Sequence, residues 1–243
     1  MKPEIVRTQS FVDDAVALIL NAANEAIEQR GHFRISLSGG NTPRPVYQDL
    51  GLRDCQWSKW IVTFGDERCV PPEDKQSNYR MASEAFLLQT NPGEVYRLHG
   101  ELEPDEAAIL YEQTISSLAA RFGEKRYSSD VTLLGLGDDG HTSSLFPGTA
   151  ALTENARNVV SNFVPKFNSH RLTSTYPLIN ASRCIVFLIN DSKKEAIINQ
   201  VLEGGHGYPA EKVKSIAGET LWLIGMEGAK SQKSGARNRS SYS

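Results

Sequence analysis

Hydrophobic positions recur along the chain with two different spacings, and these spacings predict helices and strands. Between residues 12 and 27, apolar side chains return every three or four positions, as they do on one face of a helix. Ser10 and Asp13 resemble a capping box at the start of this segment, and Gly31 supplies its stop. The next segment, 33–37, is short and mostly apolar, and it predicts a strand.

Strands and helices alternate along the rest of the chain. The predicted strands lie at 33–37, 60–64, 131–136, 158–163, 184–189 and 220–224, and the predicted helices at 43–50, 78–88, 104–121 and 193–202. This alternation predicts an α/β fold with a mainly parallel sheet flanked by helices. Since the sequence has neither a repeat nor an obvious linker, we expect one domain over residues 1–229. In such sheets, ligands bind beyond the carboxyl ends of the strands.

Charge is unevenly distributed along the chain. The 26 Lys and Arg residues against 29 Asp and Glu residues give a net charge of −3, which excludes a generally basic nucleic-acid-binding protein. Segment 230–243 carries no acidic residue, and we expect it to be a disordered basic tail. Without its four basic residues, 22 basic residues face 29 acidic ones, a charge of −7. Such an acidic body needs a local positive site to hold an anion.

The number of cysteines and the length of the apolar runs indicate the cellular compartment of the protein. Three cysteines, an odd number without a CxxC motif, suggest a reducing environment and no disulfide framework. Cys69 follows Arg68, and we expect a buried, inert thiol there. The N-terminus lacks the apolar region of a secretory signal, and no apolar run is long enough to span a bilayer. We therefore expect a cytoplasmic protein that does not bind membranes.

The first loop that could bind a ligand follows the strand at 33–37 and consists of Ser38, Gly39, Gly40, Asn41, Thr42 and Pro43. Paired glycines allow unusual backbone angles, and Thr42 can cap a helix that begins at Pro43. Backbone N–H groups and a helix N-terminus would then converge on one point, which suits a phosphate. An ordinary, well-capped strand-to-helix turn explains this segment equally well.

Two further segments carry charged residues next to predicted strands. Asp66, Glu67 and Arg68 follow the strand at 60–64, where charges are unfavourable unless they are paired or used. An internal ion pair is the simpler explanation for this group. Lys166 and Arg171 follow the strand at 158–163 and could form the positive wall that an acidic body needs, although they also fit a solvated loop.

The loop 135–143 contains the candidate base. Its glycines spell GxGxxG, but Asp138 and Asp139 would face a pyrophosphate with like charge, so we reject a dinucleotide site. The loop instead presents His141 beside a carboxylate, and imidazole can take a proton from water at neutral pH. A hydrogen-bonded surface histidine is the alternative. The histidines are scattered without ligand spacing, so we expect no metal.

On these residues the chain resembles the 6-phosphogluconolactonase family. Four motifs occur in the family's order: SGGNTP at 38–43, DERCVP with a later Ser-Asn at 66–71 and 77–78, GLGDDGHTSSLFPG at 135–148, and a Lys…Arg-x-Thr segment at 166–173. They span most of the chain, and DGHTSSLFPG is the most specific. The family is grouped with glucosamine-6-phosphate deaminases, so the resemblance implies a Rossmann-like sheet of the sugar-phosphate isomerase type.

The resemblance implies hydrolysis of 6-phospho-D-glucono-1,5-lactone to 6-phosphogluconate, without metal or organic cofactor. By matching position, His141 would activate water, with Asp139 in support. Arg68, Lys166 and Arg171 would hold the phosphate together with the loop 38–42. Asp66 lies where the related deaminases keep an acid/base carboxylate. The expected partner is a small phosphorylated sugar lactone, not a nucleic acid, and we expect a monomer.

Two departures from the family pattern and two competing functions stay open. The family usually has Pro-Pro after the lysine, where this chain has Phe167 and Asn168, and commonly an Asp where Gly225 stands. A deaminase or isomerase is the closest alternative, but those deaminases carry a glutamate shortly after the DGH histidine, and segment 142–147 has no carboxylate. A non-catalytic sugar-phosphate sensor is the other alternative, yet a sensor would be expected to lose the His–Asp pair.

Overall fold

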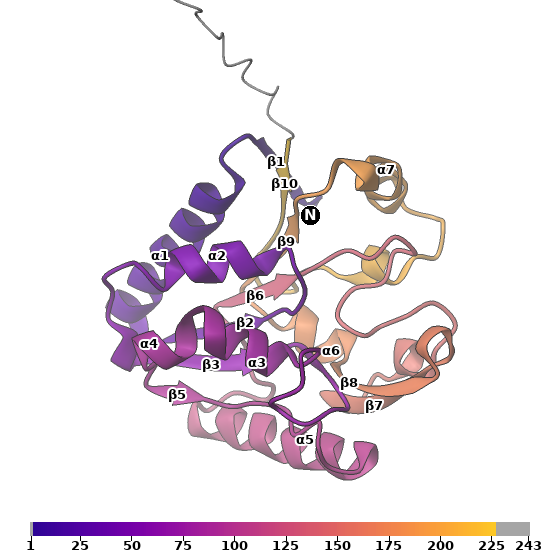
Figure 1. Ribbon diagram of the computed structural model, residues 1–243, viewed down its shortest axis with the longest axis horizontal. Helices are drawn as coiled ribbons and strands as arrows, with labels where there is room; N and C mark the ends of the chain where they lie inside the picture. Colours follow the sequence, from indigo (N-terminus) through magenta and orange to yellow (C-terminus); the bar gives the residue numbers. More distant parts are fainter. Residues whose placement is uncertain (1, 227–243) are drawn as a thin grey trace, which may run out of the picture.

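A sheet of seven parallel strands forms the centre of the computed structural model, which describes residues 2–226 (Figure 1). The strand order is β1-β10-β9-β6-β2-β3-β5. Its members are β1 (Glu4–Thr8), β2 (Phe33–Leu37), β3 (Trp60–Phe64), β5 (Glu94–Val95), β6 (Val131–Leu134), β9 (Cys184–Ile189) and β10 (Glu219–Gly225). The predicted α/β fold with a mainly parallel sheet is confirmed. The short edge strands β1 and β5 were not predicted.

Helices connect these strands and flank the sheet (Figure 1). They are α1 (Phe11–Arg30), α2 (Pro43–Leu50), α3 (Asn78–Ala82), α4 (Leu88–Thr90), α5 (Pro104–Arg121), α6 (Tyr176–Asn180) and α7 (Glu195–Glu203). The helix predicted at 78–88 exists, with a π-helical turn at Ser83–Leu87 between α3 and α4. As predicted, α1 ends at Gly31, whose φ of 77° is left-handed.

The capping box predicted at Ser10 is wrong. Its side chain makes no capping hydrogen bond. Instead, the hydroxyl of Thr8 accepts from Ser10 N at 2.8 Å and donates to the carboxylate of Asp14. These two bonds tie the end of β1 to the first turn of α1.

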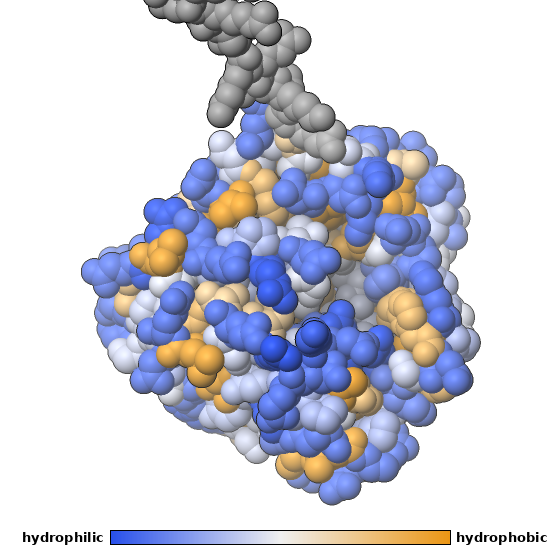
Figure 2. All heavy atoms as spheres, viewed as in Figure 1, coloured by the Kyte–Doolittle hydropathy of each residue, from blue (hydrophilic) through white to orange (hydrophobic). Residues whose placement is uncertain are grey.

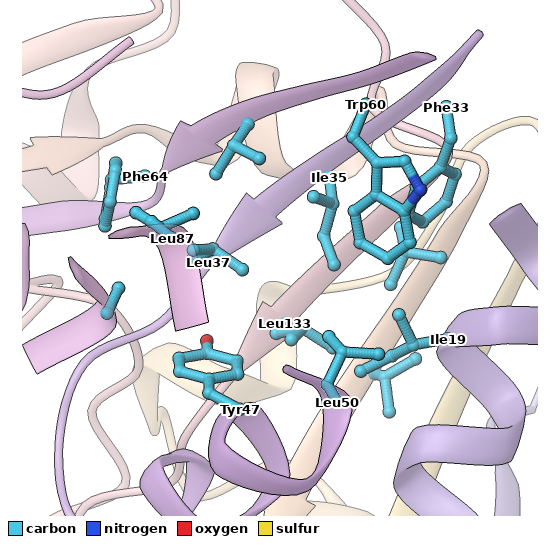
Figure 3. Packing of buried hydrophobic residues seen from close by; sticks show 14 of the residues in the cluster. Ile19, Phe33, Ile35, Leu37, Tyr47, Leu50, Trp60, Phe64, Leu87 and Leu133 are labelled. Atoms are coloured by element: carbon cyan, nitrogen blue, oxygen red, sulfur yellow. The ribbon is translucent and has the colours of Figure 1, made fainter. Parts of the chain in front are cut away.

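Side chains alternate between the two faces of the sheet and build two hydrophobic clusters. Val186 and Leu188 of β9 belong to the cluster that contains Ile19 of α1, whereas the neighbouring Phe187 belongs to the cluster that contains Ile198 of α7. Figure 3 shows the first cluster, where strand residues such as Ile35 and Leu37 face side chains of α1 and α2. Both faces of the sheet are thus covered, as is usual for a parallel sheet.

A second, smaller sheet of three antiparallel strands lies beside the first (Figure 1). It has the order β4-β8-β7, formed by β4 (Asp66–Arg68), β8 (Ser169–Ser174) and β7 (Val159–Val164). The strand predicted at 158–163 is therefore real but belongs to this sheet, and the loops expected at 66–68 and 166–173 contain strands. Their residues are largely polar, so hydrophobic spacing gave no signal for them.

Glu112 of α5 anchors the second sheet. Its carboxylate accepts hydrogen bonds from the backbone N–H groups of Asn158 and Val159, both at 2.7 Å, and from Asn158 Nδ2 at 2.8 Å. Three bonds to one carboxylate fix the start of β7 on the helix. The β7–β8 hairpin is thereby held in place beside the main sheet.

Hydrophilic side chains cover most of the face seen in Figure 2, and hydrophobic ones form small separate groups. A hollow lies to the right of the centre of this face, beyond the end of α2 (Figures 1 and 2). Among residues 2–226, no helix combines the length and the apolar character that crossing a bilayer requires. The predicted basic tail at 230–243 lies outside the described residues.

Candidate active site

A cavity of about 440 Å³ opens at the carboxyl edge of the main sheet, where the sequence placed the ligand site. The loops after β2, β6 and β9 and the second sheet line it. Nine of the eleven nominated residues line this cavity: Ser38, Gly39, Gly40, Asn41, Thr42, Asp66, Arg68, His141 and Arg171. The other two do not line the cavity: Asp139 contacts His141, and Lys166 contacts Asp139.

His141 and Asp139 form a hydrogen-bonded pair, as predicted. Asp139 Oδ1 contacts His141 Nδ1. Burial acts to raise the pKa of Asp139, but hydrogen bonds from His141 and Lys166 outweigh it and lower that pKa to about 2. The ionised carboxylate can only accept, so Nδ1 of His141 carries the proton of this hydrogen bond. Asp139 thereby fixes the orientation of the imidazole.

The backbone around His141 explains why this loop is rich in glycine. Gly137 N donates to His141 O at 2.8 Å, and a side chain at Gly137 would overlap the imidazole. Gly140 has a φ of 71°, in the left-handed region that glycine favours. On the other side, the ring of Phe146 stacks on His141 with centroids 3.9 Å apart. No helix follows this loop directly, in agreement with the rejection of a dinucleotide fingerprint.

Asp66 is buried, and both of its carboxylate oxygens are engaged. Oδ1 accepts from Asn78 Nδ2 at 3.1 Å, and Oδ2 accepts from Ser144 Oγ at 2.6 Å. Each oxygen thus already accepts a hydrogen bond from a side chain of the protein. The arrangement lets Asp66 orient Asn78 and Ser144, which both line the cavity.

Glu67 has a structural role. Its oxygens accept from Ser77 Oγ at 3.0 Å and from the backbone N–H groups of Asn78 and Tyr79 at 2.7 and 2.8 Å, at the start of α3. Burial raises the pKa of Glu67, although these hydrogen bonds favour its charged form. In the described part of the chain, neither Asp66 nor Glu67 forms an ion pair with Arg68. The internal ion pair considered for this segment is therefore absent.

Arg68 and Arg171 form a positive wall. They face each other in the antiparallel register of β4 and β8, and both line the cavity. Burial, and next the positive charge of Arg68, lowers the pKa of Arg171 from its ordinary value. The Arg171 guanidinium also lies over the ring of Phe167, 5.4 Å from its centroid. An acidic protein thus concentrates positive charge at one wall of its cavity.

The loop after β2 is fixed by Tyr47, whose hydroxyl donates to Ser38 O at 2.9 Å and accepts from Ser38 N at 3.1 Å. A side chain at Gly39 would overlap Asn78 Oδ1, while Gly40 has a φ of 98°. Gly39 is thus required because there is no space for a side chain, and Gly40 because of its backbone angle. The cap predicted at Thr42 is wrong, because its backbone is already helical (φ −65°, ψ −47°) and its side chain makes no capping bond.

Lys166 lies beside Asp139, outside the lining of the cavity. Its ammonium lies 2.9 Å from Asp139 Oδ2 and does not line the cavity. Its position follows from the turn at Pro165–Phe167, after which Asn168 has a φ of 46°. Proline cannot adopt that angle, so the Phe167-Asn168 pair suits a hairpin that a Pro-Pro pair would not.

Several cavity residues were not nominated from the sequence. Lys194 donates from Nζ to the carbonyl of Leu136, and Asn190 follows β9 directly. Both stand just beyond a strand that the sequence did predict, which was the available signal. The family commonly has an Asp where this chain has Gly225. A side chain at this residue would overlap Asn190 Oδ1, which explains the glycine. Within residues 2–226, no group of three or more His, Cys, Asp or Glu side chains is arranged to hold a metal ion.

Comparisons with known proteins show which proteins this chain is similar to. The sequence model of the family described as glucosamine-6-phosphate isomerases/6-phosphogluconolactonase matches residues 7–222. A 6-phosphogluconolactonase of Synechocystis sp. is 36% identical over 235 residues, which cover 92% of this chain and 96% of the relative. One from Nostoc sp. is 37% identical over 222 residues, or 88% and 91% of the two chains. The crystal structure of 6-phosphogluconolactonase from Thermotoga maritima superposes with a TM-score of 0.82 at 26% identity, covering 93% of this chain and all of the other.

Proposed function

The chain belongs to the glucosamine-6-phosphate isomerase/6-phosphogluconolactonase family, and from this premise we propose that it hydrolyses 6-phospho-D-glucono-1,5-lactone to 6-phospho-D-gluconate. This reaction belongs to the oxidative pentose phosphate pathway. One observation carries the proposal: the His141–Asp139 pair and the two arginines, Arg68 and Arg171, meet at one cavity. A base for the lactone and a positive wall for its phosphate are therefore within reach of the same molecule.

His141 activates water in this proposal. Nε2 takes a proton from a water molecule while the water oxygen attacks the lactone carbonyl, and Asp139 stabilises the imidazolium that forms. When the tetrahedral intermediate collapses, the bond between the carbonyl carbon and the ring oxygen breaks. The ring oxygen takes the proton back from His141 and becomes a hydroxyl. The stack on Phe146 holds the imidazole plane throughout.

The phosphate lies against Arg68 and Arg171 in this proposal, with the loop Ser38–Thr42 beside it. Two guanidinium groups of like charge repel each other, and a dianion between them removes that repulsion. Guanidinium groups also bind phosphate through charge-assisted hydrogen bonds, which are about twice as strong as neutral ones. The loop adds backbone N–H groups near the start of α2.

Deaminase chemistry has less support. The segment after His141 has no carboxylate up to Pro147. Asp66, at the position of the deaminase acid/base residue, has both oxygens engaged by Asn78 and Ser144. A non-catalytic sensor would not need the oriented His–Asp pair that this cavity keeps. Lactone hydrolysis uses all of these features.

A rapid coupled assay tests the function. Freshly prepared 6-phosphogluconolactone is added to the protein together with an enzyme that oxidises 6-phosphogluconate, and the spontaneous rate is subtracted. We expect rapid hydrolysis that unphosphorylated gluconolactone does not match. A rate equal to the spontaneous one would refute the activity, and equal acceleration of both lactones would refute the phosphate site.

We also propose that the enzyme acts in the cytoplasm as a monomer. All three cysteines are free thiols, which suits a reducing compartment. The proposed base and the two arginines of the proposed phosphate site all come from one chain, which suits a monomer. Light scattering at working concentration would give the mass that decides the oligomeric state.

A further inference from the structure

The tip of the β7–β8 hairpin reaches the catalytic pair. The last registered pair of the hairpin is Val164 with Ser169, and the short helix Pro165–Phe167 forms its tip. From this tip, Lys166 Nζ lies 2.9 Å from Asp139 Oδ2. The other oxygen of the same carboxylate contacts His141 Nδ1. Asp139 therefore bridges the lysine and the imidazole.

Aromatic packing holds the tip in this place. Phe167 meets Phe146 edge to face, with centroids 5.5 Å apart and planes at 84°. Phe146 in turn stacks on His141. The hairpin tip is thus connected to His141 in two ways. Lys166 reaches it through the carboxylate of Asp139, and Phe167 reaches it through the ring of Phe146. This packing places the ammonium of Lys166 within hydrogen-bond distance of Asp139.

We propose that Lys166 is a positioning residue for the base His141 and not a phosphate ligand: it holds Asp139 in place and takes up part of the negative charge of that carboxylate. The proposal rests on the lactonase function and names a further residue for it. An Asp139 bound only to His141 would be free to rotate. It would also place its full charge on the imidazole and stabilise the protonated ring.

Other charges near the pair do not replace Lys166. Asp138, on the same loop, is mostly exposed and lies 3.8 Å from Lys194, which comes from the start of α7. From the second sheet, Arg171 packs on Phe167, and Asp66 bonds to Asn78 and Ser144. In the described part of the chain, only Lys166 and His141 donate side-chain hydrogen bonds to Asp139. Removing Lys166 should therefore make the ring hold its proton more strongly.

Three variants of the full chain test this: Lys166→Ala, Lys166→Arg and Lys125→Ala. In Lys166→Ala, the midpoint of the His141 titration, followed by NMR on the free protein, should rise by about half a pH unit, because the lysine is half exposed and its effect is screened. The acidic limb of the kcat/KM profile should move by the same amount, while KM for the phosphorylated lactone changes less than about twofold. The His141 imidazole resonance is assigned as the signal that is missing from the spectrum of His141→Asn.

Lys166→Arg keeps the charge and should restore the original midpoint. Lys125, an exposed lysine between α5 and β6, is the control for removing one positive charge from the acidic body, and its replacement should shift nothing. An unchanged His141 titration in Lys166→Ala would overturn the proposal, as would a tenfold or greater increase in KM. If the wild-type protein fails to hydrolyse the lactone, the proposed function falls, whereas the NMR titration still decides whether Lys166 acts on His141.

Discussion

Arg68 of β4 and Arg171 of β8 stand opposite each other in an antiparallel pair of strands. Like charges in such directly opposed positions destabilise a sheet. This unfavourable contact lies at the wall of the cavity at the strand ends, where an anion would relieve it. In the proposed function, this pair is the origin of selectivity for a phosphorylated substrate.

Replacing Arg171 with Ala should therefore remove the preference for the phosphorylated lactone. Because the phosphate is remote from the bond that breaks, KM should rise by about 10- to 100-fold, the equivalent of 1.5–3 kcal/mol for a charged hydrogen bond, with a smaller change in kcat. Steady-state kinetics on both lactones measure this. Arg53→Ala, which removes an exposed arginine paired with Asp49, is the control. A loss confined to kcat would place Arg171 at the reacting carbonyl instead.

Replacing His141 with Asn should lower kcat by about 10²–10⁴ and leave KM little changed, because a general base contributes that much to the transition state. His170→Asn is the matched control, since His170 is exposed on β8 and packs only against Phe163 among aromatic side chains. Circular dichroism would verify that both variants are folded. Wild-type turnover in a folded His141→Asn protein would exclude the mechanism.

Gly137→Ala tests how closely the base must be placed. A methyl group at this residue overlaps the His141 ring, so the imidazole must move. A displacement of about 1 Å can reduce the rate by roughly 10²-fold. Gly135→Ala is the control, because it lies on the same loop and its methyl group would meet nothing within 4 Å. Similar losses in both variants would show that the loop backbone, and not the overlap with His141, is what matters.

The apolar segments of this fold were predictable from the sequence, and the polar ones were not. The strands Phe33–Leu37, Trp60–Phe64 and Cys184–Ile189 lie where the hydrophobic runs placed them. In contrast, β4 consists of charged residues and β8 mostly of polar ones, and what makes them strands is pairing with each other across about a hundred residues of sequence. Spacing along the chain carries no information about such pairing.

The candidate site divides in the same way. Motifs predicted that His141 and the arginines come together, and they line one cavity, because strand ends in a parallel sheet converge on one edge. The direction of Lys166 could not be predicted, since it depends on the left-handed backbone of Asn168 and on the packing of Phe167. Both are properties of the closed hairpin rather than of any local pattern.

The thiols should react slowly at neutral pH. Burial raises the pKa of Cys55 and of Cys69 to about 11 and that of Cys184 to about 12, and for Cys69 the nearby Arg171 opposes this only in part. Since the thiolate is the reactive form, iodoacetamide should label all three far more slowly than a free cysteine. Mass spectrometry over time measures this. Rapid labelling of Cys69 with loss of activity would show that the arginines activate it.

Arg34→Ala should destabilise the fold more than any surface ion pair can. Arg34 lies in the inner strand β2 with only 1% of its side chain exposed, and its guanidinium binds Glu124 at 2.9 Å and lies over Phe122. Removing one partner of a buried pair costs about 3–5 kcal/mol, whereas an apolar residue of similar length, as in Arg34→Met, should cost less. Urea unfolding would measure the difference. Arg157→Ala, which breaks an exposed pair with Glu154, should cost about 1 kcal/mol or less. If Arg34→Ala unfolds at the same urea concentration as Arg157→Ala, the buried arginine is not a stabilising element of the sheet.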